Sequence, residues 1–420
     1  MPRVLLLVPT ATYRTADFMA AAAKLDLEVV VGAERRNALE SVAGGGTVRV
    51  DLDDTERAAA TIVELAGTRA LDAVVGVDDG STLAAAAGAA ALGLAHNPVD
   101  AVAATHDKSR MRELFAAAGL PAPKHRLWPA DADPDEVARD RAGGGGFPCV
   151  VKPIDLSGSR GVIRADDEGE LATAFARVAA IVRAPDVCRP GHAAQPILVE
   201  DFIAGREVAL EGLLRDGRLE TLAIFDKPDP LDGPTFEETI YVTPSRESPE
   251  TQSAVIDTVA RGAAALGLRE GPIHAEVRLD GEVAWPLEIA SRSIGGLCGR
   301  TLRFGVGVSL EELILRHAVG LPLPDEWLRR ERAASGVMML PIRRSGRLVE
   351  VRGEDEARAV PGIVGLSITI PLGGDLVPLP EGDRYLGFLF ARADAPDEVE
   401  AALREAHSRL DVVVESRLDG

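Results

Sequence analysis

Residues 274–292 have the sequence HAEVRLDGEVAWPLEIASR, in which polar and apolar residues alternate on both sides of Asp280-Gly281. The alternation predicts two strands, and the Asp-Gly pair predicts a tight turn between them, so the segment should form a β-hairpin. This hairpin would bring Glu276 close to Glu288. Two neighbouring carboxylates repel each other unless a cation lies between them, and a ligand set made only of oxygen suits Mg²⁺. Two unrelated surface acids would give the same pattern, so the hairpin alone leaves both interpretations open.

The residues around this hairpin add three candidates for ligand binding. Arg292 follows Glu288 by four positions and could hold a carboxylate or a phosphoryl oxygen through paired hydrogen bonds. Gly295 and Gly296 come next and would let the backbone approach a ligand closely. His274 differs from the other histidines because it lies beside Glu276. We expect structural or exposed roles for the histidines that lack a partner pattern: His96, His125, His192, His317 and His407.

A second segment predicts a phosphate site. Lys152 ends the apolar run that starts at Val150, and Ser157, Gly158, Ser159 and Gly161 follow within ten residues. An ammonium group at the end of a strand can pair with a phosphate, and backbone N–H groups of a glycine-rich loop can surround the same anion. The lysine precedes the glycines, so this is not a Walker A motif. A solvent-facing lysine before an ordinary turn is the alternative interpretation.

A third segment, residues 198–207, resembles a nucleotide-contacting linker in composition. Its sequence LVEDFIAGRE places a strand before a short linker, with Glu200 and Glu207 seven positions apart. A linker of this type can present backbone groups to a purine edge while a later carboxylate accepts ribose hydroxyl groups. Taken alone, this segment is better explained as a turn with solvated acids.

The order of predicted elements indicates an α/β protein with several domains. Strands and helices alternate through the first hundred residues, which predicts a parallel, doubly wound sheet. No GxGxxG follows the first strand, so a nicotinamide site is not supported. Residues 228–249 are rich in Pro, Gly and acids without periodicity, and their length favours a functional lid. The residues after Ser335 predict a small α+β unit.

Composition excludes several classes of protein. The chain has 420 residues and a formal net charge of −20, which makes it a poor binder of nucleic acid. Its three cysteines form no CxxC pair, so neither a zinc site nor a disulfide framework is indicated. The apolar N-terminus is better explained as a strand than as a signal peptide, and no apolar run reaches the ~20 residues of a membrane span. We expect a cytoplasmic protein that binds neither nucleic acid nor a membrane.

Taken in order along the whole chain, these segments resemble the ATP-grasp superfamily. The resemblance implies that Lys108 and Lys152 bind phosphate and that the loop 157–162, with Ser157, Gly158, Ser159 and Gly161, closes over it. For the nucleotide it implies an adenine hinge at Glu200, Phe202 and Ile203, a ribose-binding acid at Glu207 and a third phosphate-contacting lysine at Lys227. For the reaction it implies magnesium ligands at Glu276 and Glu288, a catalytic arginine at Arg292, and substrate contacts at His274, Arg292, Gly295 and Gly296.

The resemblance also implies how the domains are arranged. We expect an ATP-grasp fold with an N-terminal doubly wound parallel-sheet domain at residues 1–104 and a C-terminal α+β unit at residues 331–420. Between them should lie a small ATP-grasp subdomain at 105–200 and a large one at 201–330, with ATP bound between the two halves. Many members carry Glu-x-Asn at the second metal acid, whereas this chain has Glu288-Ile289-Ala290 and lacks that further ligand.

The form Glu-Ile-Ala-Ser-Arg followed by Gly-Gly is similar to the L-amino acid ligase branch, which makes dipeptides, with carnosine synthase-like ligases nearby. The lid residues 232–238 and the tail residues 361–363 and 384–388 fit that branch as well. The resemblance implies an ADP-forming ligase that uses ATP and Mg²⁺ (two ions, with Mn²⁺ as an alternative) to join an amino acid or similar carboxylic acid to an amine through an acyl phosphate. It suggests small-molecule substrates and a homodimer. The alternatives are a carboxylase-type or purine-biosynthetic ligase, and a nucleotide-binding regulator without turnover.

Overall fold

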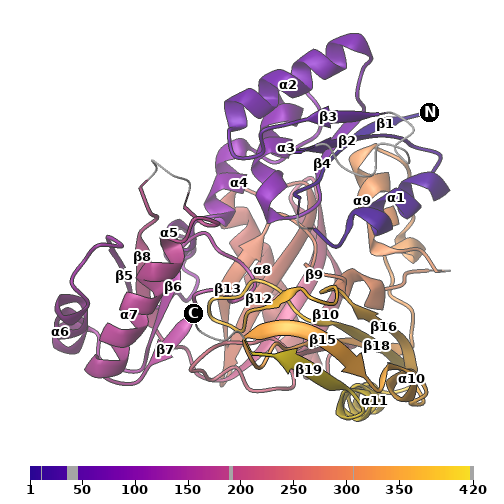
Figure 1. Cartoon of the computed structure of the whole chain (residues 1–420). Coiled ribbons are helices and arrows are strands. Elements are labelled where there is room, and N and C mark those ends of the chain that lie inside the picture. Colours follow the sequence, from indigo (N-terminus) through magenta and orange to yellow (C-terminus); the bar gives the residue numbers. More distant parts are fainter. Residues whose placement is uncertain (11, 36–45, 189–192, 306, 417–420) are drawn as a thin grey trace.

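The computed structural model describes residues 1–10, 12–35, 46–188, 193–305 and 307–416 (Figure 1). His192, for which we predicted no functional role, lies outside these ranges. The described residues form three main sheets and one small sheet. Within the described ranges no helix is both long enough and apolar enough to cross a membrane.

The N-terminal part is a parallel sheet covered by helices on both faces. Its strand order is β3-β2-β1-β4, with β1 at Arg3–Leu7, β2 at Glu28–Ala33, β3 at Thr47–Arg49 and β4 at Ala73–Gly76. Val4 and Leu6 pack towards α1 (Thr15–Lys24), whereas Leu5 and Leu7 pack towards α2 (Thr55–Thr68) and α3 (Asp79–Leu92). Burial on both faces explains the continuous apolar run in β1. The doubly wound parallel sheet predicted for this region is therefore confirmed.

The second sheet is antiparallel and belongs to the small lobe on the left of Figure 1. Its strand order is β5-β8-β6-β7, with β5 at His125–Trp128, β6 at Cys149–Pro153, β7 at Ile163–Ala165 and β8 at Ile197–Asp201. Helices α6 (Pro134–Gly144) and α7 (Glu168–Val182) cover it. Helices α4 (Val99–Thr105) and α5 (Lys108–Ala117) connect the N-terminal part to this lobe. Asp107 caps α5, because its side chain accepts a hydrogen bond from the N–H of Arg110.

The third sheet has eight antiparallel strands and forms the centre of the molecule, in the order β13-β12-β9-β10-β11-β14-β18-β16. Their bounds are β9 Arg206–Arg215, β10 Arg218–Asp226, β11 Ile240–Thr243, β12 Gly271–Asp280, β13 Val283–Ala290, β14 Ala334–Leu340, β16 Ile363–Ile368 and β18 Gly387–Ala393. Helices α5 and α8 (Pro249–Leu266) share one apolar core with β9, β12 and β13. Because β11 joins β10 to β14, the sheet runs without a break across residue 330, where we expected the C-terminal unit to begin.

The remaining elements complete the C-terminal region. A small sheet has the order β17-β15-β19, with β15 at Gly346–Arg352, β17 at Asp375–Leu376 and β19 at Asp411–Glu415. Helix α11 (Pro396–Ser408) packs on β14 and β18, α10 (Glu354–Arg358) packs on β16, and α9 (Leu310–Ala318) lies beside α1.

One sequence prediction is wrong in part. We expected residues 228–249 to be an aperiodic lid, but Ile240–Thr243 within them is β11, a strand that is buried in the large sheet. Its residues Ile-Tyr-Val-Thr are all strand formers, and the run is too short for an alternating pattern to be visible. Residues 229–239 form the loop that precedes the strand and contributes Glu238 to the site described next.

Candidate active site

A cavity of about 120 Å³ lies between the four-stranded antiparallel sheet β5-β8-β6-β7 and the eight-stranded sheet. It is lined by most of the residues that the sequence singled out, namely Lys108, Lys152, Ser157, Gly158, Ser159, Glu200, Phe202, Ile203, Glu207, His274, Glu276, Glu288 and Arg292. Four other candidates are not among its lining residues: Gly161, Lys227, Gly295 and Gly296. Segments that lie far apart in the sequence therefore meet at one cavity between the two halves of the protein.

The predicted pairing of the two hairpin acids is confirmed. Glu276 on β12 lies directly opposite Glu288 on β13 in the antiparallel register. The carboxylate of Glu288, however, faces Lys108, with the ammonium nitrogen 3.3 Å from Oε2. A carboxylate and a lysine from different elements thus neutralise each other at the wall of the cavity.

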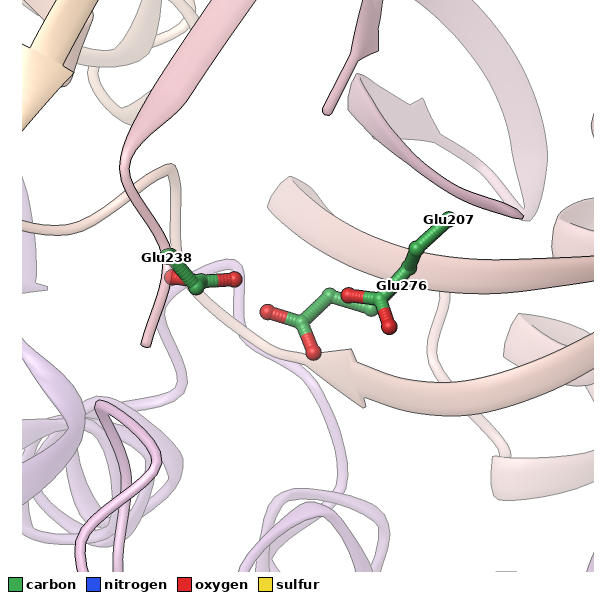
Figure 2. Close-up of side chains that lie close together, drawn as sticks. All are labelled: Glu207, Glu238 and Glu276. Atoms are coloured by element: carbon green, nitrogen blue, oxygen red, sulfur yellow. The ribbon is translucent and has the colours of Figure 1, made fainter. Parts of the chain in front are cut away.

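The other hairpin acid, Glu276, belongs to a group of three carboxylates. Oxygen atoms of Glu207, Glu238 and Glu276 all lie within 4.8 Å of one another, and Figure 2 shows the three side chains converging. Burial, together with the negative charges of Glu238, Glu207 and Glu288, raises the pKa of Glu276 to about 8 against the opposing effect of Lys227. Sequence analysis gave Glu238 no role, because the segment that carries it has no periodicity.

Lys227 neutralises part of the charge of this acidic group. Its ammonium nitrogen lies 2.5 Å from Glu207 Oε1 and 3.5 Å from Glu276 Oε1, and it also donates a hydrogen bond to Glu238. Burial disfavours the charged ammonium, but the three carboxylates hold the pKa of Lys227 well above its usual value. Arg278 provides a second cation by donating to Glu207 Oε2 at 3.0 Å. In this structure Glu207, which we expected to contact a ribose, is therefore occupied by two cations.

Two of the three lysines predicted to bind phosphate, Lys108 and Lys152, are buried at the cavity wall. Lys108 donates to the carbonyl oxygen of Leu156 at 2.7 Å, at the start of the glycine-rich loop. Lys152 lies 2.5 Å from Glu200 Oε1. Burial lowers the pKa of Lys152 to about 8, although Glu200 favours the charged form.

The glycine-rich loop is held by the C-terminal region. Gly158 and Ser159 both have left-handed backbone conformations, with φ of 63° and 58°, which turn the loop sharply over the lysines. The N–H of Gly161 donates to the carbonyl oxygen of Pro380 at 2.9 Å, so this glycine fastens the loop instead of lining the cavity. Arg177 on α7 adds an ion pair with Glu381.

Glu200 is held by two cations, of which Arg112 is not evident from the sequence. Arg112 is fully buried on α5, and its guanidinium nitrogens lie 2.9 and 3.2 Å from the two oxygens of Glu200. Burial opposes ionisation of Glu200, but Arg112 and Lys152 lower its pKa to about 2. The Glu200 carboxylate therefore holds Arg112 and Lys152 in place at the cavity wall. The linker after Glu200 can contact a ligand through its backbone groups.

Replacing Glu200 with glutamine is expected to lower the free energy of unfolding by about 2 kcal/mol, because two buried cations lose their counter-charge. Since the pKa of Glu200 is about 2 when folded and 4.5 in the unfolded reference, its contribution is present above pH 4.5 and is lost as the pH falls towards 2. Urea unfolding at neutral pH and at low pH measures both effects. The exposed Glu64→Gln variant is the control, and equal stability of the two variants at neutral pH would contradict this account.

The hinge after Glu200 borders an apolar slot. Val150, Leu231 and Phe236 form a buried cluster against which Phe202 and Val162 pack. The Phe202 and Phe236 rings lie 6.3 Å apart. Arg278 donates to the carbonyl oxygens of Ile203 and Leu231 at 3.0 and 2.9 Å, and so links the hinge to the loop that carries Glu238. A slot with apolar walls beside a polar backbone edge can hold a planar heterocycle.

Arg292 and His274 also line the cavity. Arg292 lies just beyond β13, and its guanidinium donates to Asp79 Oδ2 at 2.8 Å. The sequence analysis assigned no functional role to Asp79. His274 Nδ1 lies 3.2 Å from Glu211 Oε2, and burial lowers the pKa of His274, which favours a neutral imidazole. Glu211 also accepts the N–H of Ile294 at 3.0 Å and fixes the loop after Arg292.

Gly296 has a packing role in this structure. Its φ is +59°, and a Cβ atom built on it would lie 2.9 Å from the ring of Phe388. The glycine is therefore required by the close contact between the 293–297 loop and β18. Ligand contact at Gly295 and Gly296 stays a prediction.

Comparison with known proteins gives consistent similarities. Residues 145–301 match the ATP-grasp domain family, and residues 338–415 match the L-amino acid ligase C-terminal domain 2 family. The chain is 25% identical over 267 residues to alanine–anticapsin ligase of Bacillus subtilis, covering 60% of this chain and 55% of that protein. The chain thus spans about half the length of that relative. It is 30% identical over 241 residues to D-alanine–D-alanine ligase of Gloeobacter violaceus, covering 54% of this chain and 72% of that protein.

Solved structures share the fold over almost the entire chain. The L-amino acid ligase of Bacillus licheniformis superposes with a TM-score of 0.81 at 24% identity, covering 99% of both chains. N5-carboxyaminoimidazole ribonucleotide synthetase of Thermotoga maritima superposes with a TM-score of 0.70 at 17% identity, covering 99% of this chain and 100% of that chain. At these identities the structures establish the architecture.

Proposed function

Because this chain belongs to the ATP-grasp ligases, with the C-terminal domain of the L-amino acid ligases, we propose that it joins an amino acid to an amine or second amino acid at the expense of ATP. The observation that carries the proposal is one cavity that combines two buried lysines, a group of three carboxylates and an arginine. Lysines suit phosphate, grouped carboxylates suit Mg²⁺, and an arginine suits a substrate carboxylate.

The residues present fit Mg·ATP. The pKa of Glu276 is raised because burial and three other carboxylates disfavour its charge, and a divalent cation would relieve that repulsion. Glu207, Glu238, Glu276 and Glu288 supply only oxygen ligands, which suits two Mg²⁺ ions, with Mn²⁺ as a substitute. The apolar slot beside Phe202 would hold the adenine. When bound, ATP supplies the phosphoryl group that converts the substrate carboxylate into an acyl phosphate.

The chain's own residues would then position and shield the reactants. Lys108, Lys152 and Lys227 would neutralise phosphate charge, and Arg292 would orient the carboxylate and stabilise the charge that develops on it. The loop 157–162, fastened to Pro380, would exclude water from an acyl phosphate that water hydrolyses. Attack by the amine would release phosphate and leave an amide.

The proposal is tested by measuring phosphate release from ATP and Mg²⁺ across pairs of amino acids, with mass spectrometry of the wells that respond. We expect release that requires both partners, together with ADP and a condensed product. A product that appears only with bicarbonate or a phosphorylated riboside would favour the carboxylase-type or purine-biosynthetic alternative. ATP binding without release in any well would favour a regulator.

ATP affinity should depend on pH through Lys152. Its pKa is about 8 in the protein, so the ammonium is present below that pH and is lost above it. We expect the affinity for a non-hydrolysable ATP analogue to be constant below about pH 8 and then to fall by up to about tenfold per pH unit. Calorimetric titration on both sides of this pH measures the trend. A Lys152→Arg variant, which stays charged, should show a flat profile; a decline of equal slope in this variant would assign the effect to another group.

A further inference from the structure

The strongest feature that the proposed mechanism does not use is an ion pair between the N-terminal domain and the active site. Asp79 is the first residue of α3, and Arg292 lies 213 positions away, just after β13. The Arg292 nitrogen lies 2.8 Å from Asp79 Oδ2, and the two side chains are 11% and 29% exposed. The acid therefore keeps access to solvent beside the arginine that lines the cavity.

Asp79 has capacity left for a ligand. Across the described ranges, its carboxylate accepts a hydrogen bond only at Oδ2, from Arg292, and a carboxylate can accept several. Burial opposes ionisation of Asp79, but Arg292 lowers its pKa to about 2, so the group is negative at neutral pH. An ionised carboxylate with an unused oxygen next to a substrate-binding arginine is suited to receive a cation.

Arg292 does not depend on Asp79 alone for its orientation. It also donates to the carbonyl oxygen of Ser293 at 3.1 Å. Ser293 is held in turn by the fully buried Arg14, which donates to its hydroxyl oxygen at 2.7 Å. The loop that carries the arginine thus has an anchor that is separate from Asp79, and a second function for Asp79 is compatible with the geometry.

We propose that Asp79 recognises the ammonium group of an α-amino acid whose carboxylate is bound by Arg292. An α-amino acid carries its two opposite charges on one carbon atom, and the Arg292–Asp79 pair offers the two matching charges side by side. A carboxylic acid without the amino group would compete with Asp79 for Arg292 and would bring no cation to Asp79 in exchange. This inference rests on the proposed function and adds Asp79 to Arg292 as a residue that determines the specificity of the acid site.

The test separates the acid half of the reaction from the amine half by using hydroxylamine as the nucleophile. Phosphate release from Mg·ATP is measured with three matched pairs of probes: L-alanine and propionate, L-leucine and isocaproate, and L-phenylalanine and hydrocinnamate. Each pair differs only in the ammonium group. The ratio of kcat/KM for the amino acid to that for its partner acid is compared between the wild-type protein and Asp79→Asn, which can still accept a hydrogen bond from Arg292. Asp17→Asn is the control, since Asp17 pairs with Arg300 at 2.9 Å.

In the wild-type protein we expect an amino acid of one pair to be preferred over its partner acid. In Asp79→Asn this preference should fall by about 10- to 100-fold through loss of the amino acid reaction, and Asp17→Asn should retain it. Asp79→Glu should restore part of it. An unchanged preference in Asp79→Asn, or equal losses for both members of a pair, would overturn the assignment and leave Asp79 as a residue that only positions Arg292. No acid-dependent release by the wild-type protein would instead contradict the proposed function.

Discussion

Replacing Arg292 with alanine is expected to lower kcat for ligation by about 100- to 1,000-fold while changing the affinity for ATP by less than about threefold. The guanidinium lines the cavity and pairs with Asp79, whereas Lys108 and Lys152 are the lining residues that suit phosphate. Its removal should therefore affect the step in which charge develops on the substrate carboxylate, and leave nucleotide binding in place. Initial rates of phosphate release and calorimetric titration with an ATP analogue measure the two quantities separately.

Arg300→Ala is the matched control for this prediction. Arg300 also comes from the segment after β13 and also pairs with an acid of the N-terminal domain, Asp17, but it does not line the cavity. We expect its activity to stay within about threefold of the wild-type value. Wild-type turnover by Arg292→Ala, with ATP binding retained, would remove Arg292 from the mechanism.

Replacing Lys227 with methionine is expected to lower the free energy of unfolding by about 3–5 kcal/mol in the absence of metal. The ammonium group is 3% exposed and lies among Glu207, Glu238 and Glu276, so its loss leaves three carboxylates with Arg278 as their remaining cation. Urea unfolding followed by the fluorescence of the three tryptophans provides the measurement. Lys24→Met, which removes a lysine that is 62% exposed, is the control and should change stability by less than about 1 kcal/mol.

The effect of Mg²⁺ on the stability of Lys227→Met should show whether the three carboxylates form a metal site. If the carboxylates bind Mg²⁺, the ion should stabilise Lys227→Met more than the wild-type protein, because it replaces a missing positive charge. A destabilisation below about 1 kcal/mol would show that the acids are not held together by the lysine. A large destabilisation that Mg²⁺ does not reduce would argue against a metal site at this acidic group.

Local patterns in the sequence were sufficient to predict the structural features that depend on residues close together in the chain. The opposition of Glu276 and Glu288 followed from alternation around a tight turn. The parallel N-terminal sheet followed from the alternation of strands and helices. These features depend on backbone geometry over a few residues, which a sequence displays directly.

Contacts between distant segments could not be derived in this way. Asp79 meets Arg292, and Arg112 meets Glu200, only because separate sheets are packed together. Glu238 joins the acidic group because β11 enters the large sheet and fixes the end of the loop that carries the acid. None of the three has a local pattern around it, although Asp79, an acid shortly after a strand end, could have been noted as a candidate.

The central claim is that the chain activates a carboxylate by phosphorylation, and isotope transfer tests it most directly. The protein is incubated with Mg·ATP and a mixture of the common amino acids labelled with ¹⁸O in their carboxylate groups, and the released phosphate is analysed by mass spectrometry. Our account predicts ADP and inorganic phosphate that carries one ¹⁸O atom from the carboxylate, because the acyl phosphate breaks at its carbonyl carbon when the amine attacks. Unlabelled phosphate, or AMP and pyrophosphate in place of ADP, would contradict it.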